Sequence, residues 1–238
     1  MIDRALKLVV AGLAPLLLLG CVLTPGKFVS TMTINADRSF AFTYKGEVIA
    51  IDPGSAMKKM GDKPTEDIDT PKPLSLAQAE PPAAEPDEDS EAKNRAIAAA
   101  LAKEAGYRSA VYQGKGKFLI DYAITGVLTH SFVFPFNADA EAVFPFIVVE
   151  LRSGKTVRIK APGFSSNGPS GSAGSGMANP MPKESKLLDG TFTLDTDADV
   201  VSQNNEDGAK ALGKRRVISW RVTPLTKDAP TAVLQLAR

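Results

Sequence analysis

The sequence is poor in the residues that build most metal and disulfide sites. Its 238 residues include one cysteine, one histidine and one tryptophan. A single cysteine excludes an internal disulfide, and one cysteine with one histidine cannot form a Cys/His zinc cluster. Charge of one sign is also scarce, since 28 Lys and Arg residues face 27 Asp and Glu residues. This balance argues against a nucleic-acid-binding protein, which would need a basic excess.

Long hydrophobic runs are equally scarce. One uncharged apolar run, Leu8–Leu19, follows Arg4 and Lys7 near the start of the chain. A membrane-spanning helix needs about 20 apolar residues, so this run is too short to cross a bilayer. Its length and its basic flank are typical of a signal peptide. We therefore expect residues 1–20 to be an export signal and not part of the fold.

The cysteine stands where this run ends, in the tetrad Leu18-Leu19-Gly20-Cys21. The tetrad resembles the lipobox of bacterial lipoproteins. The resemblance implies that the Cys21 thiol receives a diacylglyceryl group, that cleavage falls between Gly20 and Cys21, and that the new amine is acylated. Each buried methylene contributes roughly 0.8 kcal/mol, so two or three chains anchor strongly. The alternative is an ordinary secretory peptide with a chance or buried cysteine.

The residue after the cysteine bears on location. In Gram-negative lipoproteins an Asp at this position signals retention in the inner membrane, and here the residue is Val22. This implies a cell-envelope protein, at the outer membrane and facing the periplasm if the source is Gram-negative. The expected partner is thus the membrane, reached through the lipid anchor and a short tether over residues 21–27.

Alternating apolar residues predict a β-hairpin at the start of the domain. The expected strands are Phe28–Ile34 and Ser39–Ile51, joined by the polar turn Asn35–Arg38. The Ala-rich segment Glu91–Gly106 predicts a helix capped by Ser90, with a narrow apolar stripe that packs on a sheet.

Most of the remaining chain predicts short strands. They are Ala110–Gln113, Lys117–Leu128, Ser131–Phe136, Phe144–Arg152, Thr156–Lys160, Thr191–Leu194, Val200–Ser202, Arg216–Thr223 and Thr231–Leu236. Two segments, at about 59–90 and 164–186, are rich in Pro and acidic residues or in Gly and Ser, and predict disordered insertions. The expected fold over residues 28–238 is a single α+β domain: antiparallel sheet or sheets packed with one main helix.

One pair of residues raises the possibility of a hydrolase. A catalytic triad would have to use His130, with Ser131 beside it and an Asp supplied by folding. Adjacent strand residues point to opposite faces, so the two side chains do not pair by default. We therefore favour a structural role for His130.

An acidic series suggests calcium ligands at first sight. Asp195, Asp197, Asp199 and Glu206 resemble parts of an EF-hand loop. Val200 stands where that loop needs glycine, and flanking helices are not expected. A solvated acidic turn is the favoured interpretation, and we expect neither a metal nor a cofactor.

Two groups of basic residues complete the candidate sites. They are Arg152, Lys155, Arg158 and Lys160 in one hairpin, and Lys214, Arg215, Arg216 and Arg221 near the C-terminus. Facing a membrane, such groups would contact anionic head groups at roughly 1 kcal/mol per residue. Solvated strand faces are the more common use of such residues.

Two segments resemble LppM-type bacterial lipoproteins. They are Cys21–Ile51, a lipidated cysteine followed by a hairpin with the polar turn Asn35–Ser39, and Asn205-x-x-Gly208 followed by Arg216–Thr223 around Trp220. The resemblance covers about half of the chain beyond Cys21. Many members also have a C-terminal transmembrane helix, which this sequence does not show. The family has no catalytic signature, and it implies an α+β envelope domain that accommodates a lipid or another apolar ligand.

The expected function is therefore that of a lipid-anchored, non-enzymatic cell-envelope lipoprotein. It would bind a lipid, an apolar ligand or an envelope protein partner. A periplasmic hydrolase using Ser131 and His130, and a structural subunit of an envelope assembly, remain as alternatives.

Overall fold

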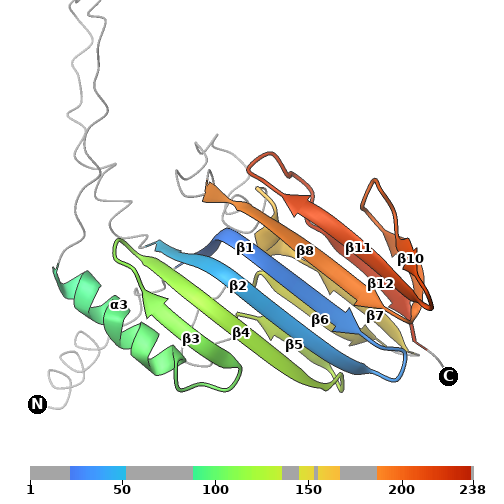
Figure 1. Ribbon diagram of the computed structural model, residues 1–238, viewed down its shortest axis with the longest axis horizontal. Coiled ribbons are helices and arrows are strands. Elements are labelled where there is room, and N and C mark those ends of the chain that lie inside the picture. The colour runs from blue at the N-terminus through green and yellow to red at the C-terminus, as the bar shows by residue number, and fades with distance from the viewer. Residues whose placement is uncertain (1–21, 52–87, 136–144, 153–154, 167–186, 237–238) are drawn as a thin grey trace, which may run out of the picture.

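The computed structural model describes residues 22–51, 88–135, 145–152, 155–166 and 187–236 (Figure 1). Two β-sheets lie one over the other. The larger contains β1 (Val22–Ile34), β2 (Ser39–Ile51), β3 (Tyr107–Tyr112), β4 (Lys117–Val127), β8 (Asp189–Thr196), β10 (Lys210–Leu212) and β11 (Arg215–Val222), in the order β10-β11-β8-β1-β2-β4-β3. The smaller contains β5 (Ser131–Phe134), β6 (Ile147–Arg152), β7 (Thr156–Lys160), β9 (Asp199–Gln203) and β12 (Thr231–Gln235), in the order β5-β6-β7-β12-β9.

The centre of the larger sheet joins segments far apart in the sequence. The hairpin β1–β2 is antiparallel, as its alternating pattern predicts, and β2 continues antiparallel to β4. On its other side β1 pairs in parallel with β8, from Lys27 opposite Asp189 to Ile34 opposite Thr196. The two turns that bound this pair, β1–β2 and β8–β9, therefore meet at one end of the sheet.

The core between the sheets is aromatic. The larger sheet contributes Phe28, Phe42 and Tyr44, and the segments facing it contribute Phe134 and Phe164. Ring centroids are 4.3 Å apart for Phe28 and Phe164, and 5.0 Å apart for Phe42 and Phe134. Most of these pairs are stacked or tilted, geometries that aromatic rings favour when buried. Side chains of the two sheets thus fill the space between them.

The predicted α+β class is wrong. Strands make up 59% of the described residues and helices 12%, so the fold is mostly β. The second layer is a sheet, not the helix. Helix α3 (Glu88–Leu101) lies beside the edge strand β3 (Figure 1), and it buries only Ala98 fully, with Ile97 and Leu101 partly buried. A stripe this narrow covers a sheet edge but not a sheet face.

The helix boundaries also differ from the prediction of Glu91–Gly106. The helix starts three residues earlier, which places the expected cap Ser90 inside its first turn, and ends at Leu101. Gly106 adopts a left-handed φ of 93° after a series of turns. A Cβ there would lie 2.5 Å from the Tyr122 ring, so the glycine serves a close approach and not a helix end.

The expected tether over residues 21–27 is corrected as well. Strand β1 begins at Val22, and residues 22–25 pair with residues 48–51 of β2. The irregular sequence Thr24-Pro25-Gly26-Lys27 is accommodated by a register shift between Pro25 and Phe28. The Pro and Gly residues suggested a tether, but they form a bulge within a longer strand.

The predicted insertions are only partly open to comparison. Within 59–90 and 164–186, most residues lie outside the described ranges. Residues 88–90 belong to α3, and Phe164, in the 3₁₀ helix η2 (Pro162–Phe164), is fully buried in the core. The predicted edges of both insertions are therefore wrong by a few residues.

Buried tyrosines predict a loss of stability at alkaline pH. Tyr44 is fully buried, and this burial raises the pKa of its hydroxyl, which donates a hydrogen bond to Glu47 O at 2.8 Å. Burial raises the pKa of Tyr107 and Tyr122 as well. In the unfolded chain a tyrosine has a pKa of about 10, so the native state holds these protons more tightly. The stability that this provides is fully present below about pH 10 and is lost as the pH rises toward the native pKa.

We therefore expect the midpoint of thermal unfolding, followed by circular dichroism, to be flat between about pH 7 and pH 9.5 and to fall above about pH 10. Each tyrosine contributes a slope of at most about 1.4 kcal/mol per pH unit. Tyr44→Phe should reduce this slope by one proton. An unchanged slope in that variant would contradict the assignment to Tyr44.

Candidate functional site

An apolar cavity of about 70 Å³ lies where α3 meets the larger sheet. Its walls are Leu23 of β1, Val48 and Ala50 of β2, Ile97 and Leu101 of α3, Tyr107 of β3, Phe118 and Ile120 of β4, and Phe134 with Pro135. All ten side chains are apolar or aromatic. Strand alternation aims the residues of β2 and β4 at the inner face, and α3 closes the edge.

A second, more open pocket of about 300 Å³ adjoins this cavity. It is lined by Glu104, Ala105, Tyr107, Tyr122 and Phe134, so it shares the rings of Tyr107 and Phe134 with the cavity. Together the two hollows reach the lower end of the 300–1,000 Å³ range of small-molecule sites. The polar groups of the outer pocket are the Glu104 carboxylate and the tyrosine hydroxyls, whose pKa burial raises and Glu104 raises further.

Helix α3 is fixed over the cavity chiefly through its first turns. The Glu91 carboxylate accepts hydrogen bonds from the Tyr112 hydroxyl at 2.7 Å and from Lys115 N at 3.0 Å. The Tyr112 bond is the main reason that the pKa of Glu91 is lowered. The Tyr112 hydroxyl also accepts from Gly116 N at 2.9 Å. The β3–β4 turn therefore holds the start of α3, while apolar contacts alone hold Ile97 and Leu101.

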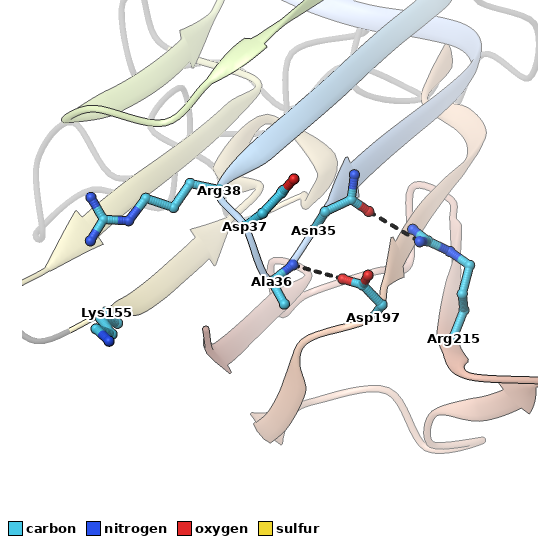
Figure 2. Close-up of a pocket in the computed structure, with 7 residues that line it drawn as sticks. All are labelled: Asn35, Ala36, Asp37, Arg38, Lys155, Asp197 and Arg215. Atoms are coloured by element: carbon cyan, nitrogen blue, oxygen red, sulfur yellow. Dashed lines mark hydrogen bonds between the residues drawn. The ribbon is translucent and has the colours of Figure 1, made fainter. Parts of the chain in front are cut away.

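A polar pocket of about 660 Å³ opens beside the β1–β2 turn (Figure 2). It is lined by Asn35, Ala36, Asp37 and Arg38 of the turn, Lys155 at the start of β7, Asp197 of the β8–β9 turn, and Arg215, the first residue of β11. Ala36 N donates to Asp197 Oδ1 at 2.7 Å. Arg215 donates through Nη1 to Asn35 Oδ1 at 3.0 Å and through Nε to Asp195 Oδ1 at 2.6 Å. The three segments are thus held together by hydrogen bonds.

Some charged side chains of this polar pocket have hydrogen-bond partners, and others have none among the described residues. Asp37 accepts from Ser39 Oγ at 2.6 Å and from Ser39 N at 2.8 Å, which lowers the pKa of its carboxyl. Arg38 and Lys155 have left-handed backbones, with φ of 75° and 86°. Within the described ranges, neither of these two side chains has a hydrogen bond or an ion pair.

The hydrolase candidates do not come together. His130 and Ser131 are both exposed, at the bend before β5 and at its first residue. The His130 ring has its hydrogen bond with Thr129 Oγ1, at 3.3 Å from Nδ1. In this arrangement the histidine cannot activate the Ser131 hydroxyl, since a general base must lie within hydrogen-bonding reach of the proton it accepts.

The acidic series is divided among different partners. Asp195 pairs with Arg215, and Asp197 accepts from Ala36 N. Asp199 and Glu206 are exposed. In the part of the chain that the structure describes, no three His, Cys, Asp or Glu residues are grouped so that they could hold a metal ion.

The two basic groups are likewise divided, and part of each forms the polar pocket. Arg152 pairs with Glu150 at 2.7 Å, and Arg221 pairs with Asp189. Lys155 of one group and Arg215 of the other line the polar pocket. The sequence does not identify this site, because its pattern predicts only a turn at Arg38 and no local spacing connects Arg38 to Lys155.

The predicted lipidation site lies outside the described residues. This holds for Gly20 and Cys21 and for the whole signal peptide. None of the helices in the described ranges is long and apolar enough to span a membrane.

Comparison with known proteins shows distant structural similarity and no family. No family model matches the chain, and no curated protein matches it. Among solved structures, the chain is similar to the NMR structure of the folded domain of LppM from Mycobacterium tuberculosis. The identity is 13% and the TM-score 0.31, over 90% of this chain and 92% of that chain. The proposals below therefore depend on the residues of this chain.

Proposed function

We propose that the chain is a non-enzymatic lipoprotein of the bacterial cell envelope that binds a lipid or another apolar ligand beneath α3. The observation that carries the proposal is the cavity of about 70 Å³ lined only by apolar and aromatic side chains. In a water-soluble fold such a lining favours an apolar occupant, since water there would find no polar partner. The acyl chains on Cys21 would hold the domain at the membrane, in a Gram-negative source at the outer membrane facing the periplasm.

The position of the cavity supports this function. Strand β1 begins at Val22, one residue after Cys21, and Leu23 is already part of the cavity wall. A lipid anchor on Cys21 would therefore place this end of the sandwich at the bilayer with little chain between them. An apolar ligand would pass from the membrane to the cavity over a short distance.

The size of the ligand follows from how α3 is held. The cavity is smaller than an ordinary ligand site, and the adjoining pocket of about 300 Å³ shares Tyr107 and Phe134 with it. Moving the second half of α3 outward would expose Ile97 and Leu101, which are already partly exposed. Fully exposing such a side chain costs about 1.5–3 kcal/mol, and each methylene of an entering chain returns about 0.8 kcal/mol. A chain of several methylenes offsets this loss.

The arrangement at His130 supports a non-enzymatic function over the hydrolase alternative. The His130 ring bonds Thr129 and not Ser131, and both candidate residues are exposed to solvent. A nucleophile without a base in reach has no means of activation.

Filling the cavity should abolish ligand binding. Ala50 lines the cavity from β2, so Ala50→Leu would place three additional carbon atoms in its space. We expect mass spectrometry of the full chain, purified from its native host, to find a bound lipid or other apolar molecule in the unmodified protein. We expect the amount of this bound molecule to be at least tenfold lower in Ala50→Leu. A fluorescent fatty acid should likewise bind more weakly to Ala50→Leu than to the unmodified protein.

The matched control is Ala41→Leu, on the same strand but on the opposite, outer face, as strand alternation requires. This variant should keep the ligand. If the unmodified chain carries no apolar molecule and binds the fluorescent fatty acid without saturation, the proposed function is wrong. Equal loss of ligand in the two variants would contradict the location beneath α3.

A further inference from the structure

We propose that the polar pocket beside the β1–β2 turn is a second binding site, which takes a ligand bearing a phosphate group. Arg38 and Lys155 would bind the phosphate, and Arg215 would orient it. This site is independent of the apolar cavity and of the function proposed for that cavity.

Two of the three cationic side chains of this pocket, those of Arg38 and Lys155, have no partner among the residues that the structure describes. The side chains of Arg38 and Lys155 have no hydrogen bond or ion pair with any described residue, and they lie on the same side of the view in Figure 2. Both have a left-handed φ, in a turn and at a hairpin start, and both line the pocket. An arginine fork and a lysine ammonium are the groups that proteins commonly use for phosphate.

The anionic groups of the pocket are by contrast already engaged. Asp37 accepts two hydrogen bonds from Ser39, and Asp197 accepts one from Ala36 N. These bonds disperse part of each negative charge, and the carboxylates keep lone pairs for hydroxyl groups of a ligand. The pocket therefore offers cations for an anion and acceptors for a polar body.

Arg215 contributes a third positive charge, held in a fixed position. Its guanidinium is fixed by Asp195 and Asn35, at 2.6 and 3.0 Å. Its remaining nitrogen, Nη2, is buried and has no hydrogen-bond partner among the described residues. Because Nη2 is buried, a ligand in the pocket does not reach this atom, and Arg215 acts on the ligand through its positive charge.

The size and place of the pocket separate it from the apolar cavity. A volume of about 660 Å³ exceeds that of a phosphate ion and suits a phosphate ester with a polar body. The pocket adjoins Asn35–Arg38, whereas the cavity adjoins Leu23 and Ala50 at the other end of the same hairpin. The cavity extends along β1 from the level of Leu23 to the level of Phe28, which pairs through Gly46 with Ile120, so roughly 23–40 Å of strand separate it from Asn35.

The test uses the full chain in non-ionic detergent micelles, followed by NMR. The probes are inorganic phosphate, glycerol 3-phosphate, and micelles doped with phosphatidylglycerol or, for comparison, phosphatidylcholine. We expect saturable shifts of the amide signals of Ala36, Arg38 and Lys155. In Arg38→Asn and in Lys155→Asn we expect the affinity to fall about tenfold, because each variant loses a charged hydrogen bond.

Asparagine is chosen because it tolerates a left-handed backbone, so both variants should fold. The matched control is Lys115→Asn. Lys115 is also an exposed lysine with a left-handed φ, of 54°, but it lies in the β3–β4 turn at the cavity end. This variant should bind the probes like the unmodified chain.

The outcomes distinguish the source of the phosphate. Saturable binding of the free phosphates that depends on Arg38 and Lys155 supports a soluble phosphate ester. The same dependence with phosphatidylglycerol micelles alone supports a lipid head group. No saturable binding of any probe, or an equal effect of all three substitutions, would overturn the proposal.

Discussion

Replacing Cys21 by alanine is expected to abolish lipid attachment completely. The thiol is the only group in the chain able to form the thioether, because the sequence has no second cysteine. In the native host, incorporation of radiolabelled palmitate should fall to background. The precursor should also keep residues 1–20, since the lipoprotein signal peptidase acts after the thioether has formed.

Gly20→Ala provides the control for this substitution. It changes the neighbouring residue but keeps both a small side chain and the thiol, so labelling and cleavage should continue. Labelled palmitate in the Cys21→Ala protein would show that the lipid is attached at another residue and would contradict the assignment to Cys21. An unmodified chain without label would remove the lipid anchor from the proposed function. The cavity beneath α3 would then need a ligand supplied from solution.

The Cys21→Ala substitution should also change the location of the protein, because it would remove all the acyl chains. At roughly 0.8 kcal/mol per buried methylene, two or three chains bind far more strongly than any surface contact of this domain. The Cys21→Ala protein should therefore no longer fractionate with the membrane that holds the lipidated protein. Since β1 begins at Val22, an anchor on Cys21 would also determine which end of the sandwich faces the bilayer.

The hairpin β1–β2 shows what the sequence could predict. Strand β2 has the predicted bounds, Ser39–Ile51, because alternation is strict where one face is buried under a second sheet. The start of β1 was missed, since Pro25 and Gly26 break the pattern that continues across the bulge. Local pattern identified the strand but not the irregular pairing at its start.

The fold class could not be predicted in the same way. The local pattern of each segment in the smaller sheet predicts a strand, but it does not predict which sheet the strand joins. Strand β12 lies between β7 and β9, and β8 pairs with β1 across more than half of the chain. From the sequence alone, the predicted helix is therefore the expected second layer. Its few buried residues, of which Ala98 is the most complete, show that it covers an edge instead.

The candidate sites could not be predicted either, because their residues lie far apart in the sequence. In the polar pocket, Arg215 and Asn35 are 180 positions apart, and Asp197 and Ala36 are 161 apart. The apolar cavity likewise takes its walls from α3, from four strands of the larger sheet and from the end of β5. No spacing rule covers such distances. Both sites follow from the meeting of strand ends, which only the assembled sheets determine.

A row of three residues in the larger sheet should be the most sensitive point for stability. Phe28 pairs with Gly46 on one side and with Gly190 on the other. The Phe28 ring lies 4.3 Å from Phe164 and is 5% exposed. Both glycines are buried, and their lack of a side chain makes room for Phe28 at the centre of the core.

Gly46→Ala is expected to destabilise the fold by roughly 3 kcal/mol, at the upper end for overpacking. The added Cβ would overlap Lys27 O and lie 2.6 Å from Phe28 Cα, and backbone atoms in a paired strand cannot move aside cheaply. For a chain of this size we expect a fall in Tm of about 6–12 °C by circular dichroism. Gly126→Ala is the control, because its Cβ meets only the Phe40 ring, at 3.1 Å, on an exposed glycine. Equal melting temperatures in the two variants would contradict the packing at Phe28.

Two double variants separate crowding by the Phe28 ring from crowding by the backbone. They combine Phe28→Leu with Gly190→Ala and with Gly46→Ala. A Cβ at Gly190 would lie 2.5 Å from atoms of the Phe28 ring, so a smaller side chain should recover part of the stability that Gly190→Ala loses. At Gly46 the clash is with the backbone of Lys27 and Phe28, and the same replacement should recover little. A double-mutant cycle measures this difference as a coupling energy, which should be larger for the Phe28–Gly190 pair. The Phe28 ring is thus the nearest obstacle at Gly190, with Phe28 O next at 2.7 Å, whereas at Gly46 the backbone and Cβ of the Lys27–Phe28 segment are the obstacle, and Leu would keep all of these atoms.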